Sequence, residues 1–231
     1  MIDTSTSRGK LIAAALALAT ERPWQEVQLI DIAERAGLPL DEVRRAAGSK
    51  SQILAHFMRA VDDEVLSAVR SRQQGSSKRD SLFDIIMSRL DILAPHKEAL
   101  RSIRRAGATD TTLVMPFLNA QRWMLAAAGI ETDGPGGLVR TLGLGSLYAA
   151  VFDTWLDDDD PGMARTMAAL DRRLRRAETA VSSVSGLASG CDRIARDLGA
   201  VGSAIFSQIF SPRRQPRAPA DDPQATTPPR A

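Results

Sequence analysis

The chain has 231 residues, of which 44% are hydrophobic and 25% charged, as in an ordinary folded protein of one domain or of a small domain joined to a larger one. Its 30 Lys and Arg residues nearly balance 28 Asp and Glu residues, so the net charge of +2 excludes a surface that is basic all over. A single cysteine, Cys191, and two histidines exclude an internal disulfide and a Cys/His metal site, and we expect no catalytic site, cofactor or metal.

Apolar residues recur at spacings of three and four along most of the chain, which predicts an all-α protein. The apolar run 11–19 also resembles the core of a signal peptide, but we favour a helix because a helix-turn-helix pattern follows it without a break. No other stretch approaches the ~20 apolar residues that span a bilayer. The predicted helices cover residues 7–20, 29–36, 40–47, 50–70, 80–93, 96–105, 112–128, 137–156, 161–179 and 187–210.

Polar, Gly/Pro-rich and acidic segments separate these helices at 71–78, 131–137 and 157–162. From residue 211 onward, six of the twelve prolines fall within 21 residues, and we expect this tail to be disordered. The resulting division is a helix-turn-helix module at 1–62, a ligand-binding and dimerisation bundle at 63–180, an amphipathic helix at 181–210 and the tail at 211–231.

The N-terminal module has the most organised pattern in the sequence. Ala33 and Ala36 allow two helices to cross closely, and Gly37 supplies the turn that a helix-turn-helix requires. Residues 7–62 resemble the N-terminal domain of the TetR family. The resemblance implies a TetR-like fold in which the third helix enters the major groove of DNA, and a homodimer formed by the last helices of the bundle.

The third helix departs from the TetR pattern. Asp41 and Glu42 stand at its N-terminus, where carboxylates repel the DNA backbone, and Arg44 takes the place of the family's tyrosine. Residues 1–60 contain eight basic and seven acidic side chains, a net charge of only +1. We therefore interpret the module as mainly structural, and DNA binding through Arg44, Arg45 and Lys50 is the alternative.

Two segments of the bundle and the terminal helix resemble a second family. Residues 89–97 and the acidic turn 156–161 with the helix 166–174 are similar to the accessory proteins of coenzyme Q (ubiquinone) biosynthesis. That family has a TetR-like fold and binds isoprenoid lipids. The resemblance implies a non-enzymatic cytoplasmic protein, peripheral on the inner membrane, that hands an isoprenoid lipid or ubiquinone intermediate to an enzyme of the pathway.

The terminal helix 187–210 has an apolar stripe with phenylalanines near its end and three arginines, 213, 214 and 217, just beyond it. Such a helix can lie in a membrane interface, where each basic residue adds ~1 kcal/mol on an anionic surface. Docking on its own bundle or on a partner subunit is an equal alternative. The residues expected to enter the membrane are Leu198, Val201, Ile205, Phe206, Ile209 and Phe210.

A group of large side chains in the predicted helices 112–128 and 137–156 belongs to the core by default, and can also line an internal apolar pocket. These candidate ligand residues are Trp123, Leu147, Tyr148, Val151, Phe152 and Trp155. The main hypothesis is thus a lipid-binding accessory protein of ubiquinone biosynthesis, and the alternative is a ligand-responsive transcriptional regulator. We interpret the acidic turn as a solvated helix start, and His56 and His96 as structural.

Overall fold

The computed structural model describes residues 2–69, 77–107 and 111–185, and in these ranges all regular structure is helical. These helices confirm the sequence prediction to within three residues at each end, except that the last of them ends at residue 185, six residues beyond its predicted end and past residue 180, where the sequence division ended the bundle. They are α1 (Ser7–Glu21), α2 (Leu29–Ala36), α3 (Leu40–Ala46), α4 (Lys50–Val69), α5 (Lys78–Leu93), α6 (Lys97–Arg105), α7 (Val114–Ala127), α8 (Gly134–Leu156) and α9 (Ala164–Ser185), with short 3-10 turns η1 (Ala94–His96) and η2 (Thr111–Leu113).

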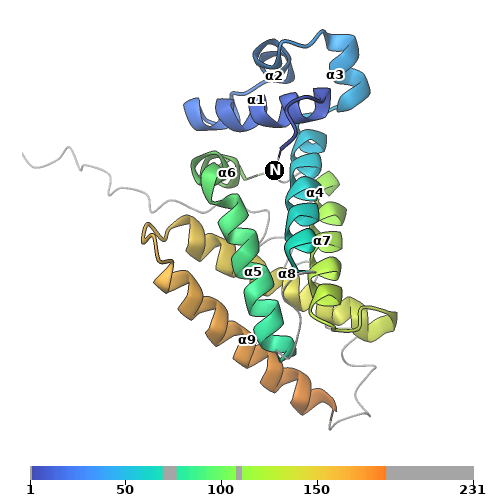
Figure 1. Cartoon of the computed structure of the whole chain (residues 1–231), viewed down its shortest axis with the longest axis vertical. Coiled ribbons are helices and arrows are strands. Elements are labelled where there is room, and N and C mark those ends of the chain that lie inside the picture. Colours follow the sequence, from blue (N-terminus) through green and yellow to red (C-terminus); the bar gives the residue numbers. More distant parts are fainter. Residues whose placement is uncertain (1, 70–76, 108–110, 186–231) are drawn as a thin grey trace, which may run out of the picture.

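Helices α1, α2 and α3 form a module at one end of the molecule (Figure 1). The helix α1 begins at Thr6, whose hydroxyl accepts a hydrogen bond from the Gly9 amide at 3.1 Å. Apolar residues follow in almost every position of α1, so this helix is buried on more than one face. It packs against α2, α3 and α4 and, on its other side, against α6 of the bundle.

The long helix α4 connects the module to the bundle. It runs without a break through residue 62, where the sequence division placed the end of the module. Ser49 accepts a hydrogen bond from the Gln52 amide at 3.2 Å, and the Gln52 side chain accepts one from the Gly48 amide at 2.7 Å. These contacts fix the first turn of α4, the helix that joins the module to the bundle.

The bundle consists of α4 to α9, with α8 at its centre (Figure 1). Asp133 is the N-cap of α8 and Pro135 stands in its first turn, so the helix begins three residues before the predicted start. Its apolar residues pack against α5, α6, α7 and α9. Val151 and Trp155 are completely buried, as expected for the central helix of a bundle.

The acidic turn before α9 is only partly solvated, contrary to its interpretation from sequence. Asp158 is 1% exposed and accepts hydrogen bonds from the amide and the hydroxyl of Thr166, at 2.9 and 2.7 Å. These bonds lower the pKa of Asp158, led by the hydroxyl. Asp160 accepts from the Ala164 amide at 3.1 Å. Both carboxylates therefore fix the start of α9.

The predicted terminal helix 187–210, its six membrane-binding residues and the tail 211–231 lie outside the described residues. The membrane-interface hypothesis consequently stays a prediction from sequence.

Candidate functional site

Helices α2 and α3 form a helix-turn-helix whose geometry follows from the sequence between them. Gly37 has φ of +65°, the left-handed conformation that glycine adopts most readily, and it ends α2. Pro39 then precedes α3, and its backbone carbonyl accepts the first hydrogen bonds of that helix. Val43 is buried on the inner side of α3, together with Ile32 and Ala33 of α2. The opposite side of α3 faces the solvent.

The exposed side of α3 carries two arginines and an apolar residue. Arg44 and Arg45 are exposed, and the Leu40 side chain has 58% of its surface accessible. Leu40 and Arg44 are four residues apart, so they stand on the same side of the helix. An exposed leucine beside an arginine adds nothing to the core of the module. Such a pair suits contact with DNA bases, where leucine packs on a thymine methyl group and arginine binds guanine.

The structure reduces the electrostatic objection raised by the two carboxylates of α3. Glu42 is half-buried and accepts a hydrogen bond from the Ser7 hydroxyl at the N-terminus of α1. Its charge is thus directed toward the positive end of the α1 dipole. Asp41 forms an ion pair with Arg45 at 2.7 Å, and both side chains are largely exposed. Asp41 is the carboxylate that still opposes DNA binding. Its ion pair engages Arg45, which could otherwise contact a phosphate group.

Lys50, the third predicted DNA contact, has an internal role instead. Its ammonium group donates hydrogen bonds to the carbonyl oxygens of Trp24, at 3.0 Å, and Val27. It also lies 4.6 Å from the centroid of the Trp24 ring, and burial lowers the pKa of Lys50. The lysine therefore holds the α1–α2 loop against α4. The sequence pattern gave no sign of this, because the loop and α4 are more than twenty residues apart.

Some of the other basic side chains of the module form ion pairs and others do not. Arg22 pairs with Asp31 and Arg35 with Glu21, which ties the end of α1 to α2. Arg8, Lys10 and Arg44 are exposed and form no ion pair within the part of the chain that the structure describes.

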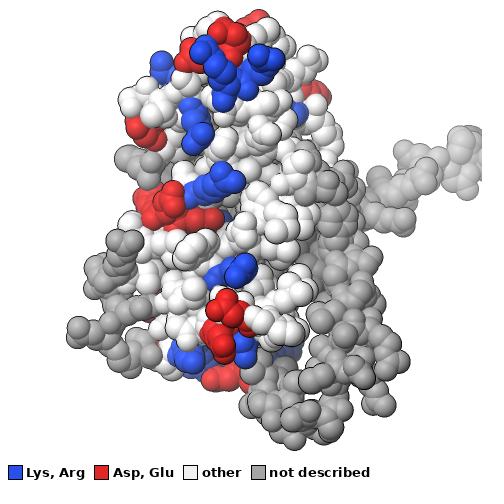
Figure 2. Space-filling view, turned by 90° about the vertical axis from the view of Figure 1, so that its right-hand side faces the viewer, with Lys and Arg blue, Asp and Glu red and all other residues white. Residues whose placement is uncertain are grey.

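Figure 2 shows acidic and basic side chains next to one another at the module's end of the molecule, rather than a continuous basic surface. The module consequently offers few unpaired cations to DNA, among them Arg8 and Lys10 at the start of α1 and Arg44 in the last turn of α3.

The predicted ligand residues do not come together around a described cavity. Leu147, Tyr148, Val151 and Trp155 are buried in the core around α8, and Phe152 packs against them. Trp123 lies apart on α7 with 60% of its surface exposed. Met115 of α7 and Leu138 and Val139 of α8 are exposed as well, so α7 and the start of α8 present large apolar side chains to solvent.

Three polar side chains from three helices contact one another in the core: Asp62, Arg89 and Tyr148. Arg89 of α5 is 4% exposed, donates a hydrogen bond to the Tyr148 hydroxyl at 3.1 Å and forms an ion pair with Asp62 of α4. Burial raises the pKa of Asp62 even though Arg89 lies beside it, so the pair does not fully offset the desolvation of the carboxylate. These contacts connect α4, α5 and α8. They involve Tyr148, which the sequence assigned to a ligand pocket.

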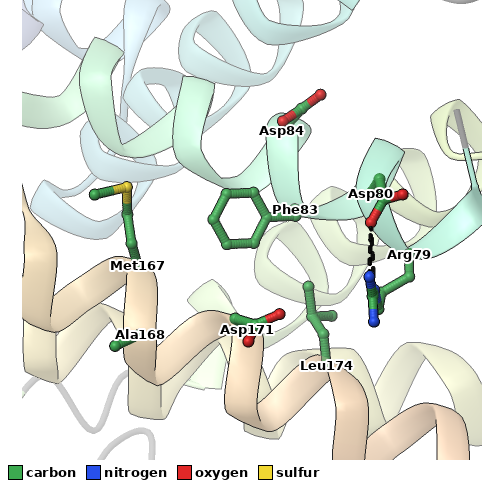
Figure 3. A pocket seen from close by; sticks show the side chains of 8 residues that line it. All are labelled: Arg79, Asp80, Phe83, Asp84, Met167, Ala168, Asp171 and Leu174. Carbon is green, nitrogen blue, oxygen red and sulfur yellow. Dashed lines mark hydrogen bonds and ion pairs between the residues drawn. The ribbon is translucent and has the colours of Figure 1, made fainter.

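Two surface cavities are described, both outside the predicted ligand site. The larger lies between the module and the bundle and includes His96. The smaller is a groove of about 450 Å³ between α5 and α9, with Phe83, Met167 and Leu174 along its floor (Figure 3). Arg79 and Asp80, neighbours on α5, form an ion pair at one end of that groove at 3.0 Å.

The described residues include no group of three or more potential metal-ligating side chains, and none of their helices has the length and hydropathy of a membrane span.

Searches against family models and curated proteins find no match to this chain. The coenzyme Q resemblance therefore receives no support from them.

Solved structures do match. A TetR transcriptional regulator from Nitrosomonas europaea is 23% identical with a TM-score of 0.58, over 74% of this chain and 97% of that one. A TetR regulator from Rhodococcus sp. RHA1 is 20% identical with a TM-score of 0.54, over 75% and 96%. A tetR-family regulator from Streptomyces coelicolor is 17% identical with a TM-score of 0.50, over 87% and 89%. The fold is TetR-like, as the sequence predicted.

Proposed function

We propose that the protein is a non-enzymatic transcriptional regulator that binds DNA through α3, which was the alternative hypothesis from the sequence. The observation that carries the proposal is the exposed side of α3, where Leu40 points away from the core and Arg44 forms no ion pair with any described residue, on a helix otherwise anchored by Val43. The similarity to solved TetR regulators supports the same conclusion.

The mechanism follows from the placement of the side chains. Seated in a major groove, α3 directs Arg44 toward a guanine and Leu40 toward a thymine methyl group. Arg8 and Lys10 at the start of α1 lie next to the N-terminus of α3, because Ser7 is hydrogen-bonded to Glu42, and they supply phosphate contacts. Arg45 joins them once phosphate competes with Asp41. The low charge of the module predicts a modest salt dependence, since few counterions are released.

We further propose that the protein acts as a homodimer whose interface includes the exposed apolar side chains of α7 and α8. Met115, Trp123 and Leu138 have more than half of their surface exposed, an arrangement that a monomer in water does not favour. Two modules then read two half-sites separated by one or more helical turns, ~34 Å apart for one turn. The operator is expected to be a palindrome.

The test is selection of binding sequences from a random duplex library, followed by affinity measurement at 150 mM salt. We expect an enriched palindrome with an affinity in the nanomolar range, compared with micromolar or weaker binding to a scrambled duplex. Arg44→Ala should weaken specific binding ~5- to 150-fold, the value of one bidentate base contact. Asp41→Ala should strengthen binding several-fold, because it frees Arg45 and removes a charge of the wrong sign.

Arg175→Ala is the matched control. Arg175 pairs with Asp171 four residues earlier on α9, as Arg45 does with Asp41 on α3, and both pairs are exposed. It should leave DNA affinity unchanged. Absence of any enriched sequence, or equal affinities of Arg44→Ala and Arg175→Ala, would overturn the proposal.

Binding of an isoprenoid lipid and of a membrane surface stays a second proposal, supported by the sequence of residues 187–210 and their basic flank. Flotation with liposomes that contain anionic lipid tests it. The full chain should float, and a chain ending at residue 186 should not. Equal flotation of the two forms contradicts it.

A further inference from the structure

The groove between α5 and α9, which we name the outer groove, has an apolar floor that is open to solvent. The Phe83 ring lies between the two helices, and Met167 and Leu174 are directed from α9 toward α5 (Figure 3). Met167 keeps 38% of its surface exposed, and Phe83 is only half-buried. Covering these side chains with further apolar groups stabilises the fold, because it removes their surface from water.

Helix α9 borders this groove at the edge of the bundle, where it packs on α8 and α5 (Figure 1). Its residues Ala169 and Leu170 face the core, whereas Ala168 and Met167 stand on the open side. The described part of α9 ends at Ser185. The segment 187–210, which the sequence predicts as an amphipathic helix, therefore starts at one end of the helix that forms the groove.

The length of this segment matches the length of α9. Helix α9 has 22 residues, which corresponds to ~33 Å, and a helix over residues 187–210 is ~36 Å long. Two helices joined by a short connection, here at Gly186, ordinarily pack as antiparallel neighbours. A reversal of the chain between residues 186 and 187 places residue 206 at the level of residue 167, and residue 199 at the level of residue 174.

This register brings the apolar face of the segment to the groove. Val201, Ile205 and Phe206 fall at the levels of residues 172, 168 and 167, which are the levels of the apolar floor. Their spacing of three and four residues, continued by Leu198 and Ile209, puts them on one side of a helix. The two surfaces are thus apolar over the same length.

The charges at the far end of the pair are complementary. The same register places Arg213 and Arg214 at the level of the acidic turn 157–160. Asp159 and Asp160 are exposed there; Asp159 pairs with Arg101 and still has 86% of its side-chain surface accessible. Opposite charges at this end favour the antiparallel arrangement over a segment that extends away from α9.

We propose that residues 187–210 dock as a helix antiparallel to α9, with their apolar face in the outer groove and Arg213 and Arg214 beside the acidic turn. The docked residues include those expected to enter a membrane, so docking and membrane binding exclude each other. This competition rests on the membrane proposal, whereas docking itself rests on neither proposed function.

The test is cysteine cross-linking in the full chain with Cys191→Ser, which removes the native thiol. The pair Met167→Cys/Phe206→Cys should be joined within one chain by a short bismaleimide. Its yield should be at least fivefold above that of the control pair Ile30→Cys/Phe206→Cys. Ile30 of α2 is the matched control, because it is an apolar residue with 40% of its surface exposed, nearly the same as Met167.

Mixing isotopically light and heavy chains before the reaction separates links within a chain from links between chains by mass spectrometry. Equal yields of the two pairs overturn the proposal. Links of Met167→Cys/Phe206→Cys that form only between chains overturn it as well, because the groove is then covered by a second copy.

Amide hydrogen exchange tests the groove in chains that keep their native cysteine. Met167→Glu places a charge on the floor at a position exposed enough to leave the core intact. It should speed exchange of the amides of residues 198–210 at least tenfold, whereas Ile30→Glu should leave it unchanged. Unaltered exchange in Met167→Glu refutes docking in this groove.

The register is tested by charge reversal at the end of the segment. Arg213→Glu/Arg214→Glu should speed exchange of the same amides at low salt, and the effect should shrink at 1 M salt, where the screening length is ~3 Å. No effect at low salt contradicts the placement of these arginines beside the acidic turn.

Liposomes that contain anionic lipid relate docking to membrane binding. The cross-linked chain Met167→Cys/Phe206→Cys should float at least fivefold less than the same chain capped with N-ethylmaleimide. If neither form floats, the membrane proposal fails, and cross-linking and exchange still decide whether the segment docks. If both forms float equally, the competition between groove and membrane is wrong.

Discussion

Replacement of Arg89 by leucine is the sharpest test of the packing at the centre of the bundle. The side chain of Arg89 is 4% exposed and that of Asp62 13% exposed, so Arg89→Leu leaves a carboxylate in the core without its counter-charge. Tyr148 also loses its hydrogen-bond donor. Breaking a buried pair from one side costs ~3–5 kcal/mol, which corresponds to a fall in Tm of about 10 °C for a chain of this size.

The double variant Asp62→Leu/Arg89→Leu distinguishes this cause from simple loss of packing. It removes both charges and fills the space with apolar groups, and it should recover the free energy of unfolding to within ~2 kcal/mol of the parent chain. Urea denaturation followed by circular dichroism, at one fixed protein concentration, measures all variants. Arg175→Leu, which breaks an exposed pair, should cost no more than ~0.5 kcal/mol. A single Arg89→Leu variant within ~1 kcal/mol of the parent, or a double variant no better than the single, would refute the reasoning.

Three further outcomes are expected. Trp123→Glu should shift the protein from dimer to monomer in light scattering, because it places a charge in the exposed apolar side of α7; an unchanged mass contradicts the proposed interface. Burial lowers the pKa of His56 and of His96, so the unfolded state binds more protons below pH ~6.5; the free energy of unfolding should fall between pH 7.5 and 5.5, and less so in His96→Gln. Asp158→Ala should cost ~1–2 kcal/mol and speed amide exchange in the first turn of α9, and unaltered exchange there counts against its capping role.

The sequence by itself determined the all-helical fold and nearly every helix boundary. Helical spacing of apolar residues, the turn at Gly37 and the prolines that begin or end helices are local signals, and each acts within a few residues of the place where it is read. The sequence also assigned the large side chains of residues 137–156 to the core by default, and most of them are buried in α8.

Only the tertiary structure decided what the polar side chains do, since their partners come from distant parts of the chain. Glu42 binds Ser7 of another helix, and Lys50 binds the carbonyls of the α1–α2 loop, so the predicted repulsion and the predicted phosphate contact are both altered. The Tyr148 hydroxyl accepts a hydrogen bond from Arg89, fifty-nine residues away in the sequence. The larger cavity is likewise a product of the tertiary structure, because its lining comes from α1, α4 and α5, which are far apart in the sequence.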